Sequence, residues 1–379
     1  MSKAQVAFIL GAGFSTYAGL PLVSDFTEQM LQPSSEEHPD NDVIIQYLRK
    51  FIHDAFDHSI NAKAKYWPEL EDVFTCIDLS ANTGHNLGAE YNSATLRTVR
   101  RALIVRMTSM LWEKYERARE QRNVKWKQLE RFIKLVDLDR TVFISMNWDT
   151  VLEAQLEKID KLRPRFTYTS DAIAVNFPES GKRIELQDGS GRTVRLIKMH
   201  GSINWLYCDN CRHLFWVPSR QVTKIAGQAL SRADWERIDR ALGNTAAHRN
   251  EKTWGCCRCD ARGLGGRIAT FSYRKALDFP MFHKSWFEAE RELRDAGAWV
   301  FIGYSLPAAD YEFKYLLKRT QLCRKPPTYM LVSQDAGDSE RTYRSYQRFF
   351  GRSIKRDENC FVNGITDEVI HRIEKLYAT

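Results

Sequence analysis

Five of the eight cysteines fall into two short clusters that have the spacing of metal ligands. Two residues separate Cys208 from Cys211, two separate Cys256 from Cys259, and 44 residues lie between the pairs. Two such pairs supply the four thiolates of a tetrahedral Zn²⁺ site, and four sulfurs leave no open position for catalysis. The sequence therefore predicts a structural zinc site, with Cys257 as a competing ligand or a bystander.

A glycine-rich turn, GAGFS, directly follows the apolar run AQVAFIL. Small residues such as Gly11, Ala12 and Gly13 let backbone N–H groups approach a phosphate at the start of a helix. The alternative is a turn that needs glycine only for tight packing. The third glycine of the dinucleotide fingerprint is replaced by Thr16, and the absence of Gly-Lys-Ser/Thr excludes a P-loop.

Polar residues follow two further apolar runs. Asn147 and Asp149 come after residues 141–146, and His200 follows residues 195–199. Open α/β sheets bind ligands beyond the carboxyl ends of their strands, where Asn147 would orient a water or a sugar hydroxyl. Asp149 would hold a neighbouring group or cap the next helix. His200 would act as a general base or serve a structural role.

A last pair of candidates follows the apolar run at residues 298–302. Gly303 and Ser305 would cup a second phosphate or a ribose, and the alternative is a turn with a helix N-cap. The apolar runs, including residues 328–332, are continuous rather than alternating. Such runs are typical of strands that are covered on both faces, so we expect a parallel α/β sheet.

The segment between the first two expected strands has a helical pattern. Its clearest stretch has apolar residues three or four positions apart, which predicts the buried face of one long helix. The stretch from residue 204 to residue 266 carries the cysteine clusters, and we expect it to be irregular. The apolar residues of the long helix are Val99, Leu103, Met107, Met110 and Leu111.

The 379 residues are enough for two or three structural units, at ~100–200 residues each. Apolar residues make up 43% of the chain, but no uninterrupted run approaches the ~20 needed to span a membrane. The first ten residues lack a signal-peptide layout, so we expect a cytoplasmic protein. A net charge of +8 favours anionic ligands without selecting one.

Taken in order, GAGFSTYAGLP, SMNWD, HGS, the two cysteine pairs and GYSLPAADY resemble the sirtuin-like superfamily over most of the chain. The resemblance implies a Rossmann-like parallel sheet with helices on both faces that binds NAD⁺, a helical insertion and a small zinc-binding module. It gives residues 1–33, 137–203 and 267–379 to the NAD-binding domain, 34–136 to the insertion and 204–266 to the module. By this resemblance Gly11, Ala12, Gly13 and Ser15 contact the pyrophosphate, Asn147 and Asp149 lie at the nicotinamide ribose, His200 is the base, and Gly303 and Ser305 face the adenosine half.

The chain departs from the protein-deacylating sirtuins at two places. Residues 19–26 read GLPLVSDF, without the arginine that those enzymes carry, and residues 269–275 hold no Phe-Gly-Glu triplet. The insertion, with LEDV at residues 70–73, looks instead like the prokaryotic sirtuin-like NAD hydrolases of anti-phage defence. The resemblance therefore implies NAD⁺ hydrolysis to nicotinamide and ADP-ribose, catalysed by Asn147, His200 and Asp149.

The same resemblance suggests a homo-oligomer and, in some relatives, a HerA-type ATPase partner. A protein deacylase and a non-catalytic sensor of NAD⁺ or ADP-ribose are the alternative functions. Direct nucleic-acid binding is a weaker alternative. It rests on Arg344, Arg348 and Arg352, spaced four apart on a helix, and a solvated face of an amphipathic helix explains the same pattern.

Overall fold

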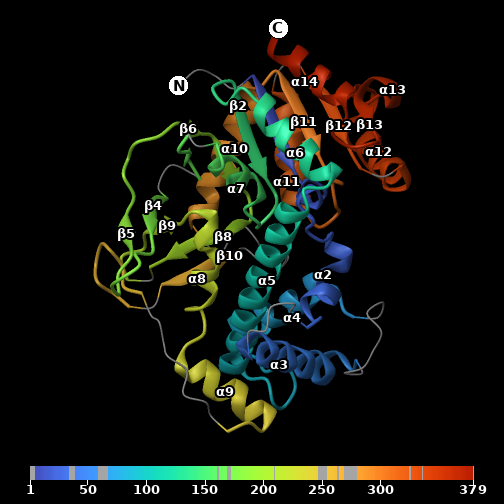
Figure 1. Cartoon of the computed structure of the whole chain (residues 1–379). Coiled ribbons are helices and arrows are strands. Elements are labelled where there is room, and N and C mark those ends of the chain that lie inside the picture. Colours follow the sequence, from blue (N-terminus) through green and yellow to red (C-terminus); the bar gives the residue numbers. More distant parts are fainter. Residues whose placement is uncertain are drawn as a thin grey trace.

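The structure is a computed structural model of the whole chain (Figure 1). It describes residues 5–33, 39–58, 67–159, 162–168, 172–208, 210–245, 254–262, 264–268, 280–323, 326–334 and 336–378. Within these ranges, no helix combines the length and the apolar character needed to cross a bilayer. Residues 269–275, which correspond to the Phe-Gly-Glu segment of the protein-deacylating sirtuins, lie outside the described residues.

The main sheet has six strands, and every neighbouring pair is parallel. All five apolar runs form strands of this sheet, so the predicted parallel α/β sheet is confirmed. The sixth strand, at the edge, is only two residues long. In sheet order the strands are β13 (Cys360–Phe361), β12 (Thr328–Val332), β11 (Ala298–Ile302), β1 (Val6–Leu10), β2 (Thr141–Ser145) and β7 (Leu196–Lys198).

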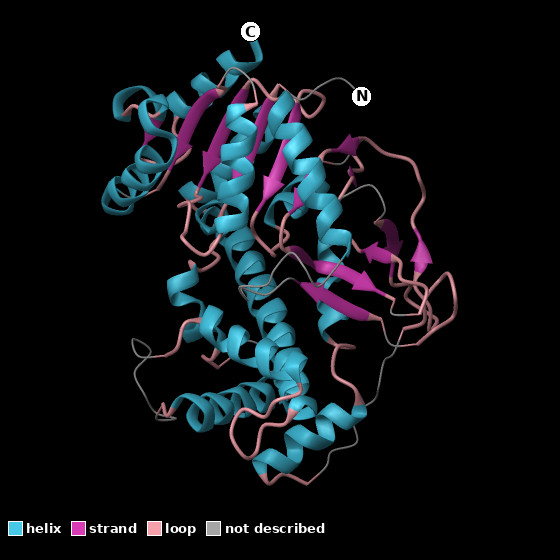
Figure 2. Cartoon of the chain, turned by 180° about the vertical axis from the view of Figure 1, so that it is seen from behind, coloured by secondary structure: helices cyan, strands magenta, loops and turns pink. Residues whose placement is uncertain are grey.

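Helices cover both faces of this sheet, which is why its strands are apolar along their length (Figure 2). Val6, Phe8 and Leu10 of β1 pack into one core, and the alternating residues Ala7 and Ile9 pack into the other. The first core includes residues of α6 (Val124–Leu135), α7 (Val151–Glu157) and α14 (Asp367–Ala378), and the second includes residues of α10 (Pro280–Asp295), α11 (Tyr311–Leu322) and α12 (Ala336–Phe350).

A long helix, α5 (Ser93–Gln121), lies with its C-terminal end near the sheet and its N-terminal end far from it, and other helices pack around it (Figure 1). The side chain of Asn92 caps its first turn by accepting from the amides of Ala94 and Thr95. The predicted stripe of five apolar residues is buried, so the expected long helix is confirmed. The other α-helices in the described part of the chain are α1 (Ala12–Ser15), α2 (Val23–Met30), α3 (Pro39–Phe56), α4 (Leu70–Thr83), α8 (Val222–Ala226), α9 (Arg232–Leu242) and α13 (Arg356–Asn359).

The cysteine-bearing stretch is more regular than expected, because it contributes to a second, five-stranded sheet and to two helices. Most of these strands have only two to four residues, too few for a periodic pattern to stand out in the sequence. In sheet order they are β10 (Gly265–Ile268), β8 (Gly201–Tyr207), β9 (Leu214–Trp216), β4 (Ile173–Asn176) and β5 (Glu185–Leu186), while β3 (Arg165–Phe166) pairs with β6 (Thr193–Val194).

Candidate functional site

Three polar side chains form a hydrogen-bonded cluster at the carboxyl edge of the main sheet. The Asn147 amide donates to the carbonyl oxygen of Gly11 at 2.8 Å and to Ser15 Oγ at 3.0 Å. The Ser15 hydroxyl donates to Asp149 Oδ2 at 2.6 Å. Asp149 Oδ1 accepts from the amide of Val151 at 3.0 Å, so this carboxylate also anchors the start of α7. The structure therefore brings together candidates from segments more than 130 residues apart.

His200 lies at the same edge, on the neighbouring strand. The parallel register of β2 and β7 pairs Ser145 with Lys198, so Asn147 and His200 each follow that pair by two residues. Neighbouring strands are ~4.8 Å apart, which makes the two loops adjacent. The His200 imidazole is almost fully buried, with 5% of its surface exposed.

One neighbour of His200 is Asp310, which the sequence analysis does not single out for catalysis or binding. His200 Nε2 lies 3.9 Å from Asp310 Oδ1, and Asp310 Oδ2 accepts from the Tyr304 hydroxyl at 2.9 Å. Burial and the charge of Asp310 hold the pKa of Tyr304 well above its usual value, so its hydroxyl remains a donor. The sequence signal that could have identified Asp310 is its position at the start of α11, in the segment that connects this helix to the carboxyl end of β11.

Two hollows adjoin these residues on different sides. One lies against α11 and is lined by His200, Asp310 and Trp286, among others. The second lies against α5, and its lining includes Asp149 and the rings of Trp112 and Tyr115. Each has about 10 Å³ of free space, which is room for about one water molecule, so a dinucleotide requires the surrounding side chains to move.

The glycine turn packs directly against the loop after β11. The amide of Gly13 donates to the carbonyl oxygen of Gly303 at 2.9 Å, and the amide of Gly11 donates to that of Ile302 at 3.1 Å. A Cβ at Gly303 would lie 2.2 Å from the backbone nitrogen of Phe14. These glycines are therefore required for a close backbone approach, and Ser305, in the same loop, is exposed. A phosphate that used the Gly11 and Gly13 amides would have to displace this loop.

A buried ion pair that the sequence did not reveal lies beneath the cluster. Lys198 Nζ is 3.2 Å from Glu153 Oε1, and each side chain is 1% exposed. The same ammonium donates to the main-chain oxygen of Asp149 at 2.5 Å. Burial raises the pKa of Glu153, and the charge of Lys198 opposes that rise. Lysine and glutamate on a strand and a helix that are separate in sequence give no local pattern from which this pair could be found.

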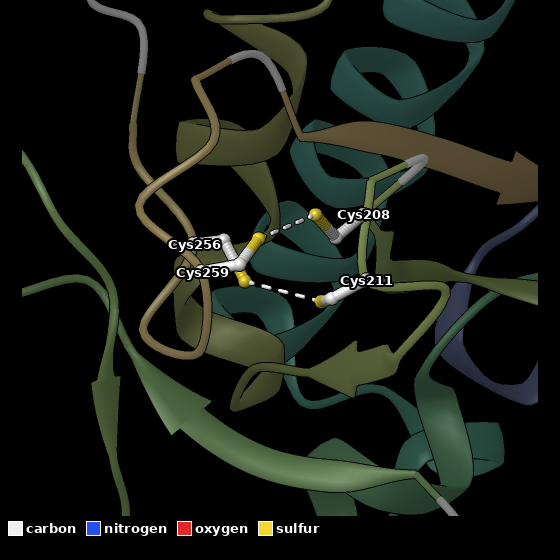
Figure 3. A group of neighbouring side chains, drawn as sticks. All are labelled: Cys208, Cys211, Cys256 and Cys259. Carbon is white, nitrogen blue, oxygen red and sulfur yellow. Dashed lines mark hydrogen bonds between the residues drawn. The ribbon is translucent and has the colours of Figure 1, made fainter.

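The four predicted zinc ligands come together (Figure 3). Cys208, Cys211, Cys256 and Cys259 place their sulfur atoms within 4.8 Å of one another, and the two cross pairs are 3.6 Å apart. A tetrahedron with Zn–S bonds of ~2.3 Å has edges of ~3.8 Å, so the cluster fits zinc. Cys257 lies outside this group. The donor set is complete with four thiolates, which fits a structural ion.

No protein-family model and no curated protein matches the sequence. Solved structures of Sir2 homologues do match it. A Sir2 homologue in complex with NAD is 14% identical over 98% of this chain and 89% of that chain, with a TM-score of 0.38. A mutant Sir2 homologue with 2′-O-acetyl ADP-ribose is 14% identical over 98% and 90%, with a TM-score of 0.42. Sir2Tm bound to a propionylated peptide is 12% identical over 100% and 94%, with a TM-score of 0.33. Likeness of this degree assigns no residue a role.

Proposed function

We propose that this protein is an NAD⁺ glycohydrolase that cleaves NAD⁺ to nicotinamide and ADP-ribose. The observation that carries the proposal is the cluster of Ser15, Asn147 and Asp149, which joins the glycine turn to the loop after β2 at the sheet edge where His200 also lies. Polar groups fixed by mutual hydrogen bonds are what positioning of a ribose and a water requires.

The reaction breaks the bond between ribose C1′ and the nicotinamide nitrogen. The bonding electron pair goes to the nitrogen, so nicotinamide leaves as a neutral molecule and positive charge develops on C1′ and the ring oxygen. Water then bonds to C1′ and loses one proton. In our proposal Asn147 holds the water or a ribose hydroxyl, Asp149 stabilises the developing cation, and His200 accepts the proton.

Leu20, Trp112 and Tyr115 form an apolar part of the lining of the hollow against α5, and the two rings are stacked with their centroids 5.4 Å apart. In our proposal these side chains move to admit the nicotinamide ring, because the hollow has room for only about one water molecule. Trp286 lines the hollow beside His200, and its buried indole N–H has no acceptor among the described residues. A buried donor of this kind is normally satisfied, so an oxygen of the bound dinucleotide is a suitable acceptor.

We expect Asn147→Ala and His200→Ala each to lower nicotinamide release by at least ~10²-fold. General-base help from His200 is worth ~10²–10⁴-fold, and misplacement of a reacting group that Asn147 holds can cost ~10²-fold. The measurement is NAD⁺ consumption with nicotinamide and ADP-ribose resolved by chromatography. Asn359→Ala is a matched control for the first variant, because Asn359 also donates to a main-chain oxygen, that of Tyr329, away from the site. His371→Ala, at an exposed histidine, is the control for the second. Folded variants with wild-type turnover would remove both assignments.

Adding an acetyl-lysine peptide to the same assay separates hydrolysis from deacylation. A glycohydrolase releases ADP-ribose without the peptide, whereas a deacylase depends on it. Nucleotide binding without turnover under all conditions would favour a sensor. We further propose a cytoplasmic, homo-oligomeric effector of anti-phage defence with a structural zinc ion, and a HerA-type ATPase is the partner to test first. The motif order and the helical insertion support this role.

A further inference from the structure

The pair of Lys198 and Glu153 is costly for the fold. Both side chains are 1% exposed, and removing two charges from water is only partly repaid by their attraction. An apolar pair of the same size would avoid this cost, but it would remove one partner from the hydroxyl of Tyr168 and one from the main-chain oxygen of Asp149. The cost of burying these two charges indicates that the pair has a role in addition to packing.

The ammonium of Lys198 contacts the site as well as its ion-pair partner. Its Nζ donates to the main-chain oxygen of Asp149 and lies 3.2 Å from Glu153 Oε1. The Asp149 carboxylate accepts from Ser15, and Ser15 in turn accepts from Asn147. Lys198 is thus connected to Ser15 through Asp149, and to Asn147 through Asp149 and Ser15.

Glu153 is held from its other side as well, which fixes the ammonium. The Tyr168 hydroxyl donates to Glu153 Oε1 at 3.0 Å, and Asn204 Nδ2 donates to the Tyr168 oxygen at 3.1 Å. Tyr168 and Asn204 are completely buried. Lys198 therefore emerges from β7 into a fixed environment, two residues before His200, and contacts a loop of the neighbouring strand.

We propose that Lys198 is a positioning residue, whose ammonium, held by Glu153, fixes the Asp149 main chain and thereby the hydrogen-bonded geometry of Ser15, Asn147 and Asp149. This proposal rests on the proposed NAD⁺ hydrolysis for its kinetic test. The structural half, a loop held by a buried ammonium, can be measured without any activity.

The kinetic test compares Lys198→Met with Arg195→Met. Arg195 immediately precedes β7 and is also buried, and it also donates to main-chain oxygens, those of Thr141 and Asp139, but at the opposite end of the strands. We expect kcat for NAD⁺ cleavage to fall ~10²-fold in Lys198→Met, since displacement of reacting groups by ~1 Å can cost this much. KM should change less than kcat, and Arg195→Met should keep kcat within about twofold of wild type. Equal losses in both variants, or none in Lys198→Met, would overturn the proposal.

The double variant Lys198→Met/Glu153→Gln separates positioning from stability. Removing both charges leaves no unpaired buried ion, so its denaturation midpoint should recover relative to Lys198→Met. Its kcat should remain low, because the contact with Asp149 is still absent. Recovery of kcat together with stability would mean that the pair has only a structural role.

Hydrogen exchange supplies the readout that does not depend on the reaction. In Lys198→Met the amide of Val151, which donates to Asp149, should exchange at least ~10-fold faster, while it stays protected in Arg195→Met. If wild-type protein releases no nicotinamide, the proposed function has failed, and this exchange alone decides the positioning role. Unchanged protection at Val151 would then reject it.

Discussion

Gly303 is a residue at which the backbone leaves little freedom. Its φ is +62°, and an added Cβ would lie 2.4 Å or less from Gly13 and Phe14 atoms. We therefore expect Gly303→Ala to destabilise the chain by more than the ~1–2 kcal/mol that a left-handed conformation costs a residue with a side chain. The glycine turn must also move to admit the methyl group, so NAD⁺ cleavage should fall as well.

The matched control for this change is Gly351→Ala. Gly351 has a similar φ of +66°, but nothing lies within 4 Å of its would-be Cβ. The two variants share the conformational cost and differ in the clash, so urea denaturation should show a clearly larger loss for Gly303→Ala. Equal losses would show that the contact between the two loops is not tight in solution.

At the scale of elements, the cysteine cluster connects the segment between β8 and β9 with residues 254–262, where Gly255 and Arg262 form an isolated bridge. We expect about one zinc ion per chain by elemental analysis of wild-type protein and none in Cys256→Ser, because a three-thiolate site loses most of its affinity. Zinc loss, by mutation or chelation, should loosen the backbone around Arg258 and Arg262, whose side chains are already exposed, so that trypsin cleaves there faster. Cys323→Ser, at an isolated exposed cysteine, is the control and should keep its zinc. Full zinc content in Cys256→Ser would contradict this ligand set.

The sequence was most informative where a local pattern determines the structure. Continuous apolar runs predicted five strands, because a strand covered on both faces needs no polar positions. Cysteine spacing predicted the metal ligands, because the geometry of a knuckle is local. The pairing of Lys198 with Glu153 and of His200 with Asp310 could not be predicted, because each pair forms only when separate elements pack. The two-residue strand β13 was missed for lack of any pattern.

At the scale of the whole molecule, the chain between the cysteine pairs ties the second sheet to the helical layer. Helix α9 packs on α3 and α5 (Figure 1). The buried carboxylate of Asp234 accepts from Thr98 at 2.6 Å and from Arg101 at 2.5 Å, both on α5. Since α5 also lines the hollow beside Asp149, a partner that moves α9 has a physical route to the site. This route is where control of the proposed NAD⁺ cleavage is most simply sought.

A second connection, between α7 and the segment after β9, makes the stability of the whole chain depend on pH. The largely buried carboxylate of Glu157 accepts from the amide and hydroxyl of Ser219, and burial raises its pKa to about 7. The unfolded chain loses this proton near pH 4.5. The folded state therefore holds an extra proton between pH 4.5 and about pH 7, and stability falls as pH rises through that window.

A pKa shift is worth ~1.4 kcal/mol per unit. The free energy of unfolding of Glu157→Gln should therefore rise by ~2 kcal/mol relative to that of wild type between pH 5 and pH 8. Urea denaturation of both proteins at both pH values measures this change. Subtracting the wild-type value from the variant value at each pH removes the effect of the other titrating groups, which the two proteins share. Glu368→Gln, at an exposed carboxylate, is the control and should show no such gain. If the difference in unfolding free energy between Glu157→Gln and wild type is the same at both pH values, Glu157 is ionised in the folded protein at pH 5.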